Sequence, residues 1–198
     1  EPAPVAAPVG ILSALALPAD RPVLFSLGNR MPHKNFPGLL RALASIAPAE
    51  RPVTVIAGSK LPDPLADDVV RLGLERDVIL PGWVTDDQLE ALYQRADLYV
   101  CPSLAEGFGL PVVDALRRRV PVLAHDVPVL REVGGDAARY ADARDADTFG
   151  AAITAALRAP VDDVARADAQ RWASRFTWDA AAEATAGVLD RVLAERAR

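Results

Sequence analysis

The chain has 198 residues, 51% of them hydrophobic, so it is long enough for one large domain with a sizeable core. Its formal net charge of −5 argues against a general nucleic-acid-binding protein, which usually has a basic balance. The single Cys101 excludes an internal disulfide framework and a multi-cysteine metal site, and no stretch reaches the roughly 20 apolar residues of a membrane helix.

The first 20 residues are rich in Ala and Pro, which is typical of a linker or entry segment, and a short helix is expected near 11–16. The apolar run 5–17 is broken by Pro8 and Gly10 and lacks a basic flank, so it does not resemble a signal peptide. Because the chain begins at Glu1 rather than Met, we expect a piece of a longer protein or a processed chain.

From Arg21 onward, short apolar runs alternate with helical patterns. The continuous Val, Leu and Ile of these runs are typical of parallel strands covered on both faces. The expected strands are 23–27, 53–57, 78–80, 98–101, 122–125 and 138–140. The expected helices are 36–47, 64–72, 86–95, 111–118, 128–133 and 147–157. Thr85 and Gln88 have the spacing of a capping box at the third of these helices.

This alternation predicts an α/β fold, a Rossmann-like, doubly wound parallel sheet of about six strands flanked by helices and joined by right-handed crossovers. Such sheets bind ligands outside the carboxyl ends of their strands. The loops that begin near Gly28, Gly58, Gly82 and Glu106 all fall on that edge.

The tail, residues 161–198, predicts two helices that are split near 176–178, with Thr177 as N-cap of the second. Apolar positions in the second helix follow a 3-4 spacing, so this helix has one apolar face that needs a partner. They are Trp178, Ala181, Ala182, Thr185, Val188, Leu189, Val192 and Leu193. We therefore divide the chain into an entry segment 1–20, a Rossmann-like domain 21–175 and a C-terminal helix 176–198.

The most informative motif runs from Glu106 to Asp114, with Gly107, Gly109 and a proline between an apolar strand and a helix. Glycines at such a junction bring backbone N–H groups to a helix N-terminus, which attracts anions and above all phosphate. A carboxylate beside an anion site is better suited to accepting hydrogen bonds from hydroxyls, as on a sugar or ribose. The motif therefore indicates a sugar nucleotide. The alternative is a surface carboxylate favoured by the helix dipole, and it is stronger for Asp114 than for Glu106.

A second candidate loop, Gly28 to Asn35, leaves the first strand and enters a helix. Lys34 can meet a phosphate as a point charge, and Arg30 can do so with two parallel hydrogen bonds. The alternative is a solvated loop with ordinary basic residues. Trp83 has two interpretations, stacking on a base or packing on the core. Cys101 is expected in the core, and His125 is more often structural at such a place.

The segment 102–111, Pro-Ser-Leu-Ala-Glu-Gly-Phe-Gly-Leu-Pro, resembles the signature of the retaining family 4 ("group 1") glycosyltransferases of GT-B fold. The resemblance extends over about residues 20–195, including the loop before Asn35, the segment 78–84 and the Phe-Thr-Trp at 176–178. It implies the C-terminal, donor-binding half of a GT-B fold, with the acceptor half on a preceding domain.

The resemblance also implies roles for individual residues. Lys34 would hold the donor diphosphate, Glu106 would bind sugar hydroxyls, and Asp114 would bind the ribose. The loop at Trp83 and Val84 would meet the base. The implied donor-binding set is Gly28, Asn29, Arg30, Lys34, Trp83, Val84, Glu106, Gly107, Phe108, Gly109, Leu110 and Asp114, with Glu106 and Lys34 as the catalytic pair.

Three positions depart from the family pattern. Asp114 stands where a glutamate is usual, Asn29 occupies the usual arginine position with Arg30 one place later, and Arg119 replaces a glycine at the end of the signature helix. If that last position requires a positive φ, the arginine costs up to about 1 kcal/mol.

We expect a domain that binds a nucleoside diphosphate sugar for retaining transfer of a hexose to a sugar or lipid-linked acceptor. No metal or other cofactor is expected, and the chain alone should bind nucleotide without turnover. The expected location is the cytoplasm, with peripheral contact at the inner face of the membrane through the other half. The alternatives are a GT-B-like sugar-nucleotide epimerase fragment and a non-catalytic interaction domain.

Overall fold

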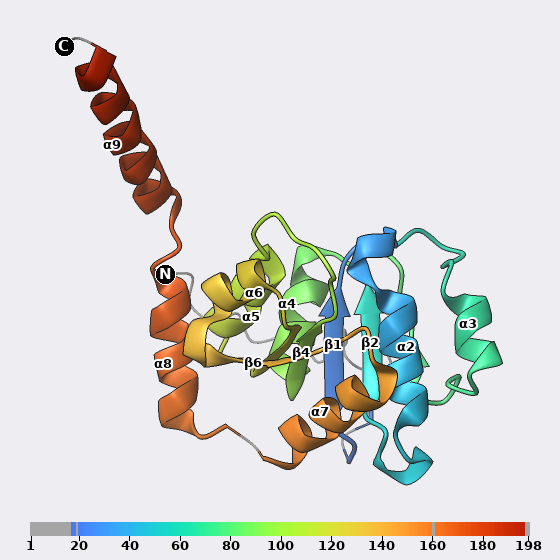
Figure 1. Cartoon of the computed structure of the whole chain (residues 1–198). Helices are drawn as coiled ribbons and strands as arrows, with labels where there is room; N and C mark the ends of the chain where they lie inside the picture. Colours follow the sequence, from blue (N-terminus) through green and yellow to red (C-terminus); the bar gives the residue numbers. More distant parts are fainter. Residues whose placement is uncertain (1–16, 19, 160, 197–198) are drawn as a thin grey trace.

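The computed structural model describes residues 17–18, 20–159 and 161–196. One six-stranded sheet, with strand order β3-β2-β1-β4-β5-β6, runs through the centre, and every registered strand pair is parallel (Figure 1). The strands are β1 (Val23–Leu27), β2 (Val53–Ala57), β3 (Val78–Ile79), β4 (Leu98–Cys101), β5 (Val122–His125) and β6 (Ala138–Ala141). The sequence prediction of a Rossmann-like, doubly wound sheet is confirmed.

Helices cover both faces of the sheet. Their bounds are α2 (Phe36–Ser45), α3 (Ala66–Arg71), α4 (Asp86–Arg95), α5 (Leu110–Arg117), α6 (Pro128–Gly134), α7 (Ala146–Arg158), α8 (Asp163–Ser174) and α9 (Trp178–Arg196). Short 3-10 helices are η1 (Pro32–Lys34), η2 (Pro48–Glu50) and η3 (Gly135–Ala137).

The two hydrophobic clusters follow from the alternation of side chains along each strand. Val23 and Phe25 face the cluster formed with α4, α5, α6 and α8, whereas Leu24 between them faces the cluster formed with α2, α3 and α7. β1, β2 and β4 are buried on both faces at nearly every position, as continuous apolar runs predict.

Most predicted elements match, and the differences have local causes. The first predicted helix ends at Ser45 rather than at 47, because Ile46 takes an extended conformation just before η2 begins at Pro48. The second begins at Ala66 rather than at 64, because the backbone carbonyl of Asp63 accepts a hydrogen bond from Ala66 and closes a turn before it. The strand predicted over 78–80 ends at Ile79, the strand over 138–140 extends to Ala141, and the other helix bounds shift by at most one residue.

Two predicted caps are present. Thr85 Oγ1 accepts a hydrogen bond from Gln88 N at 3.3 Å, and the Gln88 side chain accepts from Thr85 N at 2.9 Å. Thr177 Oγ1 accepts from Ala180 N at 3.1 Å at the start of α9. Arg119, just after α5, has a φ of 62°, so the position where a glycine was expected does require a left-handed conformation.

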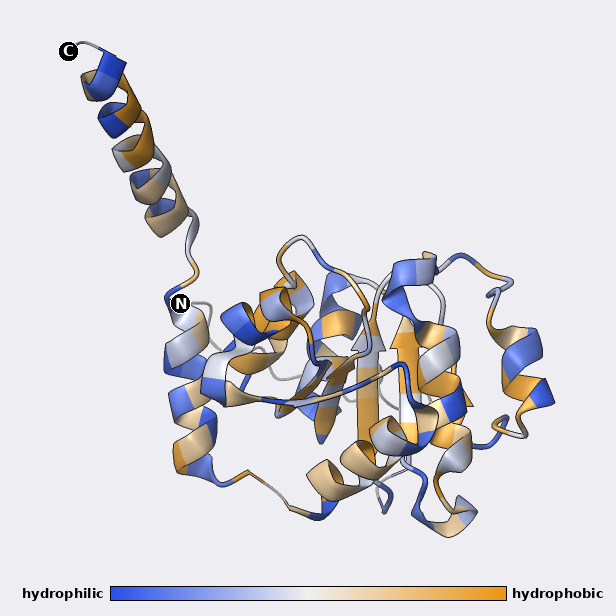
Figure 2. Cartoon of the chain, viewed as in Figure 1, coloured by the Kyte–Doolittle hydropathy of each residue, from blue (hydrophilic) through white to orange (hydrophobic). Residues whose placement is uncertain are grey.

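Helix α9 projects away from the rest of the molecule (Figure 1) and carries an apolar stripe along one side (Figure 2). Trp178, Leu189 and Leu193 are 86%, 58% and 65% exposed, and α9 has no buried residue. The predicted unpartnered face is therefore present. The helix expected near 11–16 lies outside the described residues. Within the described ranges, no helix has both the length and the apolar character to span a membrane.

Candidate functional site

The loops that follow β1, β2, β3 and β4 lie at one edge of the sheet, as the parallel strands require (Figure 1). Gly28 N donates to Ala57 O at 3.1 Å, and Gly58 N donates to Gly82 O at 2.9 Å. A Cβ at Gly58 would come within 3.0 Å of the Gly28 backbone, and Gly58 has a φ of 94°. Glycine there permits the close approach of the first two loops.

Lys34 and Glu106 are brought together across this edge from positions 72 residues apart. Lys34 Nζ lies 2.7 Å from Glu106 Oε1, and the two side chains are 16% and 11% exposed. Lys34 ends η1, and the neighbouring His33 carbonyl accepts from Leu104 N at 2.7 Å, which joins the two loops. The two residues that the sequence predicted to form the catalytic pair are therefore neighbours.

The glycine loop presents backbone donors beside this ion pair. Gly109 is the N-cap of α5 with a φ of 100°, and a Cβ there would lie 2.8 Å from Leu130 Cδ2. The N–H groups of Gly107, Phe108 and Gly109 make no hydrogen bond to any part of the chain that the structure describes. Gly107, Phe108 and Leu110 are exposed. Free amides at a helix N-terminus form a ready anion site.

Phe108 also contacts the junction between α8 and α9. Its ring lies 5.5 Å from the ring of Phe176 at an interplanar angle of 82°, and Phe176 in turn contacts Trp172. Edge-to-face geometry of this kind is favoured by the ring quadrupoles. The glycine loop is thus held from outside by the C-terminal part of the domain.

Arg30, a candidate phosphate contact in the sequence, is hydrogen-bonded within the protein. Its side chain is 8% exposed and forms a two-fold hydrogen-bonded ion pair with Asp63, at 3.0 and 2.7 Å, where Asp63 is 1% exposed. Its remaining N–H groups donate to the carbonyls of Gly28, Ala57 and Ile56 at 2.6, 3.3 and 2.9 Å. All five guanidinium donors are used inside the protein, so Arg30 has none to offer a phosphate in this structure.

Asp114 lies one helical turn into α5 and is half exposed. Its Oδ1 lies 3.5 Å from Arg118 Nη1, and Arg118 also binds Glu90 at 2.6 Å and lies over the Tyr93 ring. The structure therefore places Asp114 in a partly exposed charge network beside the site and not at the Lys34–Glu106 pair.

The predicted base-contacting loop is open to solvent. Trp83 is 67% exposed, whereas Val84 packs partly against the core. Gly82, with a φ of 80°, lies against Leu61 of the loop after β2. Asn29 is exposed, and its Oδ1 accepts from Met31 N at 3.2 Å. A stacking surface is therefore available at Trp83, since its ring is not packed into the core.

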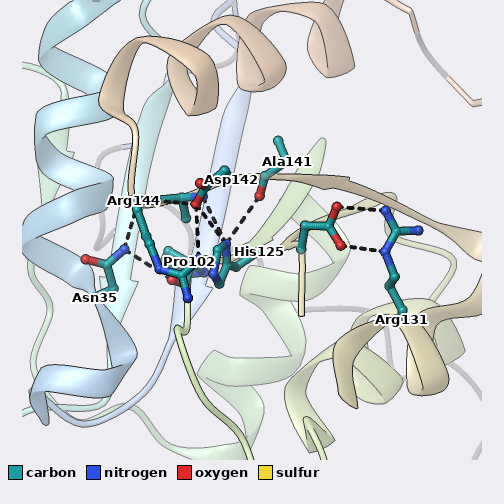
Figure 3. Close-up of polar contacts among 9 residues, drawn as sticks. Asn35, Pro102, His125, Arg131, Ala141, Asp142 and Arg144 are labelled. Carbon is teal, nitrogen blue, oxygen red and sulfur yellow. Dashed lines mark hydrogen bonds and ion pairs between the residues drawn. The ribbon is translucent and has the colours of Figure 1, made fainter. Parts of the chain in front are cut away.

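Asn35 was not predicted as a site residue, yet it connects three loops behind the ion pair. Its φ of 55° is left-handed, and its Nδ2 donates to Pro102 O at 3.3 Å and to Ala143 O at 2.9 Å. Figure 3 shows Asn35, Pro102 and His125 converging at this place. The available signal was an asparagine directly before a helix, because asparagine tolerates the left-handed region.

His125 supports the same arrangement from the end of β5. It is fully buried, and its Nδ1 accepts from Ala143 N at 3.0 Å, with Asp142 Oδ1 at 3.6 Å (Figure 3). Nδ1 also lies 3.4 Å from Ala141 O, and Nε2 has no partner among the described residues. The expectation of a structural histidine agrees with this burial. Cys101 is buried as expected, and burial raises the pKa of its thiol.

Comparison with known proteins identifies the family. The model of the family "Glycosyl transferases group 1" matches residues 11–174. The chain is 35% identical over 165 residues to O-antigen chain mannosyltransferase B of Escherichia coli, covering 77% of the chain and 42% of that protein. It is also 35% identical over 206 residues to D-inositol 3-phosphate glycosyltransferase of Kineococcus radiotolerans, covering 92% and 47%. The chain thus spans less than half the length of these curated relatives.

Solved structures share the fold at lower identity. The sucrose-phosphate synthase of Thermosynechococcus elongatus superposes with a TM-score of 0.78 at 24% identity, over 95% of this chain and 50% of that one. Anabaena Alr3699/HepE, solved in complex with UDP and glucose, superposes with a TM-score of 0.72 at 23% identity, over 87% and 49%. The sheet and its helices are those of the GT-B glycosyltransferases, and the chain belongs to the group 1 glycosyl transferases.

Proposed function

We propose that this chain is the donor-binding domain of a retaining glycosyltransferase, which takes a hexose from a nucleoside diphosphate sugar. The observation that carries this proposal is the Lys34–Glu106 pair, 2.7 Å apart, beside three backbone N–H groups without an acceptor in the described structure. The cation and the amides suit a diphosphate, and the carboxylate suits sugar hydroxyls. Membership of the family and the UDP and glucose in the Anabaena complex support the same assignment.

The chemistry assigned to these residues is electrostatic. As the bond to the anomeric carbon breaks, charge develops on the diphosphate, and Lys34 with the amides of Gly107, Phe108 and Gly109 would stabilise it. Since these groups can carry that charge, we propose transfer without a metal. We assign no general base.

The acceptor is proposed to be a sugar or lipid-linked sugar bound by a further domain, because the chain covers under half of its curated relatives. Under this proposal the protein acts in the cytoplasm or at the inner face of the membrane. This chain by itself would bind the donor without turnover.

The proposal is tested by calorimetric titration with UDP, GDP and ADP and with UDP-glucose, GDP-mannose and ADP-glucose. We expect the nucleotides of one base to bind. Lys34→Ala should weaken binding of both the free diphosphate and its sugar conjugate at least about tenfold. Glu106→Ala should weaken binding of the sugar conjugate alone. Arg158→Ala is a matched control, because it also removes one positive charge but lies in an exposed pair with Glu50, just before β2 and so at the opposite edge of the sheet. Failure of all six compounds to bind at millimolar concentration would favour a non-catalytic interaction domain.

A further inference from the structure

We propose that the Lys34–Glu106 ion pair makes the site discriminate between an intact nucleotide sugar and the nucleoside diphosphate left after transfer. The inference rests on the proposed function, because it requires a diphosphate beside Lys34 and a sugar beside Glu106. It adds one consequence of their direct contact. When either residue binds its part of the ligand, the other residue loses its partner.

Each side chain is the other's partner in this structure. Among the described residues, the 2.7 Å contact is the only hydrogen bond or ion pair that Lys34 Nζ or the Glu106 carboxylate makes. Both side chains are largely removed from water, at 16% and 11% exposed. A carboxylate in such a place is costly when it has neither a cation nor a hydrogen-bond donor.

A nucleoside diphosphate that binds without a sugar disrupts this ion pair. Its oxygens compete with Glu106 for the N–H donors of Lys34. Arg30 of the same loop does not replace Lys34, because it already donates all five N–H groups to Asp63 and to three carbonyls. The free nucleotide therefore leaves Glu106 without compensation.

An intact donor brings its own compensation. The hydroxyls of the sugar donate to Glu106 in place of the lysine, so Lys34 can turn fully to the phosphates. The ion pair thus weakens binding of the nucleoside diphosphate more than binding of the nucleotide sugar. It therefore favours release of the nucleoside diphosphate after transfer. Coupling between two separate binding sites is typically about 5- to 150-fold, and we expect the effect of this one ion pair to lie near the low end of that range.

Glu106→Gln tests the inference, because glutamine keeps the size of the side chain but cannot hold Lys34 by charge. The probes are UDP, GDP and ADP against UDP-glucose, GDP-mannose and ADP-glucose, titrated into the same 198-residue chain. We expect the variant to bind the free diphosphate about 5-fold more tightly and the sugar conjugate more weakly. Glu50→Gln, the matching change in the exposed pair with Arg158, is expected to alter neither.

A double-mutant cycle separates the ion pair from a general effect of negative charge. In a Lys34→Ala background, Glu106→Gln should no longer improve diphosphate binding. If the improvement persists in that background, or if Glu106→Gln fails to improve diphosphate binding in the natural chain, the inference is overturned while the proposed function stands. If no nucleotide binds either the natural chain or the variants, the proposed function itself is wrong, and the inference with it.

Discussion

Two ion pairs at the same edge of the sheet illustrate how similar chemistry takes different roles. Arg30–Asp63 and Lys34–Glu106 begin four residues apart in the chain, and each has a closest N–O contact of 2.7 Å. Arg30 uses every donor it has, and its partner is 1% exposed. Lys34 uses one contact and lies beside free amides. Unused hydrogen-bonding capacity, more than charge or place in the sequence, separates a ligand site from a scaffold.

The largest expected effect comes from breaking the scaffold pair. Arg30→Met keeps an apolar stem but leaves the buried Asp63 carboxylate with Leu65 N as its one hydrogen-bond donor among the described residues. Removing one partner of a buried pair costs about 3–5 kcal/mol, so we expect a loss of that size in the free energy of unfolding, measured with urea. A loss below about 1 kcal/mol would contradict the scaffold role.

Replacing Asn35 should cause the next largest loss of stability. Its side chain is neutral, but it makes two buried hydrogen bonds at a φ of 55°. Asn35→Ala removes both bonds and leaves a Cβ in the left-handed region, for a cost of about 2–3 kcal/mol. Asn35→Gly loses the same bonds without the conformational cost and should unfold less easily than the alanine variant. Equal urea midpoints for the two would show that φ is not a factor there.

Replacing Lys34 should affect ligand binding more than stability. Glu106 loses its cation when Lys34 is replaced, but at 11% exposed it keeps more access to water than Asp63 does at 1%. We therefore expect Lys34→Met to cost about 1–2 kcal/mol of unfolding free energy, less than Arg30→Met. In nucleotide titrations, the same variant should lose about tenfold or more in affinity. A stability loss as large as that of Arg30→Met would remove the distinction between the two pairs.

Arg119 should give the smallest effect, because it is the most exposed of these residues. Its ion pair with Asp163 has an N–O distance of 3.3 Å, and its side chain is 43% exposed. Such a pair contributes little, while the φ of 62° favours glycine. Arg119→Gly should therefore raise the free energy of unfolding by up to about 1 kcal/mol. Arg119→Ala removes the same side chain but keeps the conformational cost, so thermal unfolding should show no gain for it.

The sequence predicted the sheet well because parallel strands buried on both faces produce continuous apolar runs, as in β1, β2 and β4. It predicted the Lys34–Glu106 neighbourhood because loops after parallel strands share one edge. Helix ends near 46 and 64 were less predictable, since they depend on turns closed by single residues such as Asp63.

The role of Arg30 could not be predicted, because its partner Asp63 lies 33 residues away on another loop and belongs to no recognisable motif. An arginine in a glycine-containing loop favours a phosphate contact unless its donors are known to be occupied. Asn35 was missed for a related reason, since its two acceptors are backbone carbonyls 67 and 108 residues away. Carbonyl groups are present at every residue and leave no mark in the sequence.

The three tryptophans lie in three separate parts of the molecule, which makes their emission a local reporter. Trp83 is in the open loop after β3, Trp178 begins α9, and Trp172 packs in the domain with its indole N–H donating to Val133 O at 2.7 Å. Quenching by an added nucleotide that is lost in Trp83→Phe would come from the ring at the ligand edge. Quenching that is lost in Trp178→Phe would instead signal contact at the projecting helix.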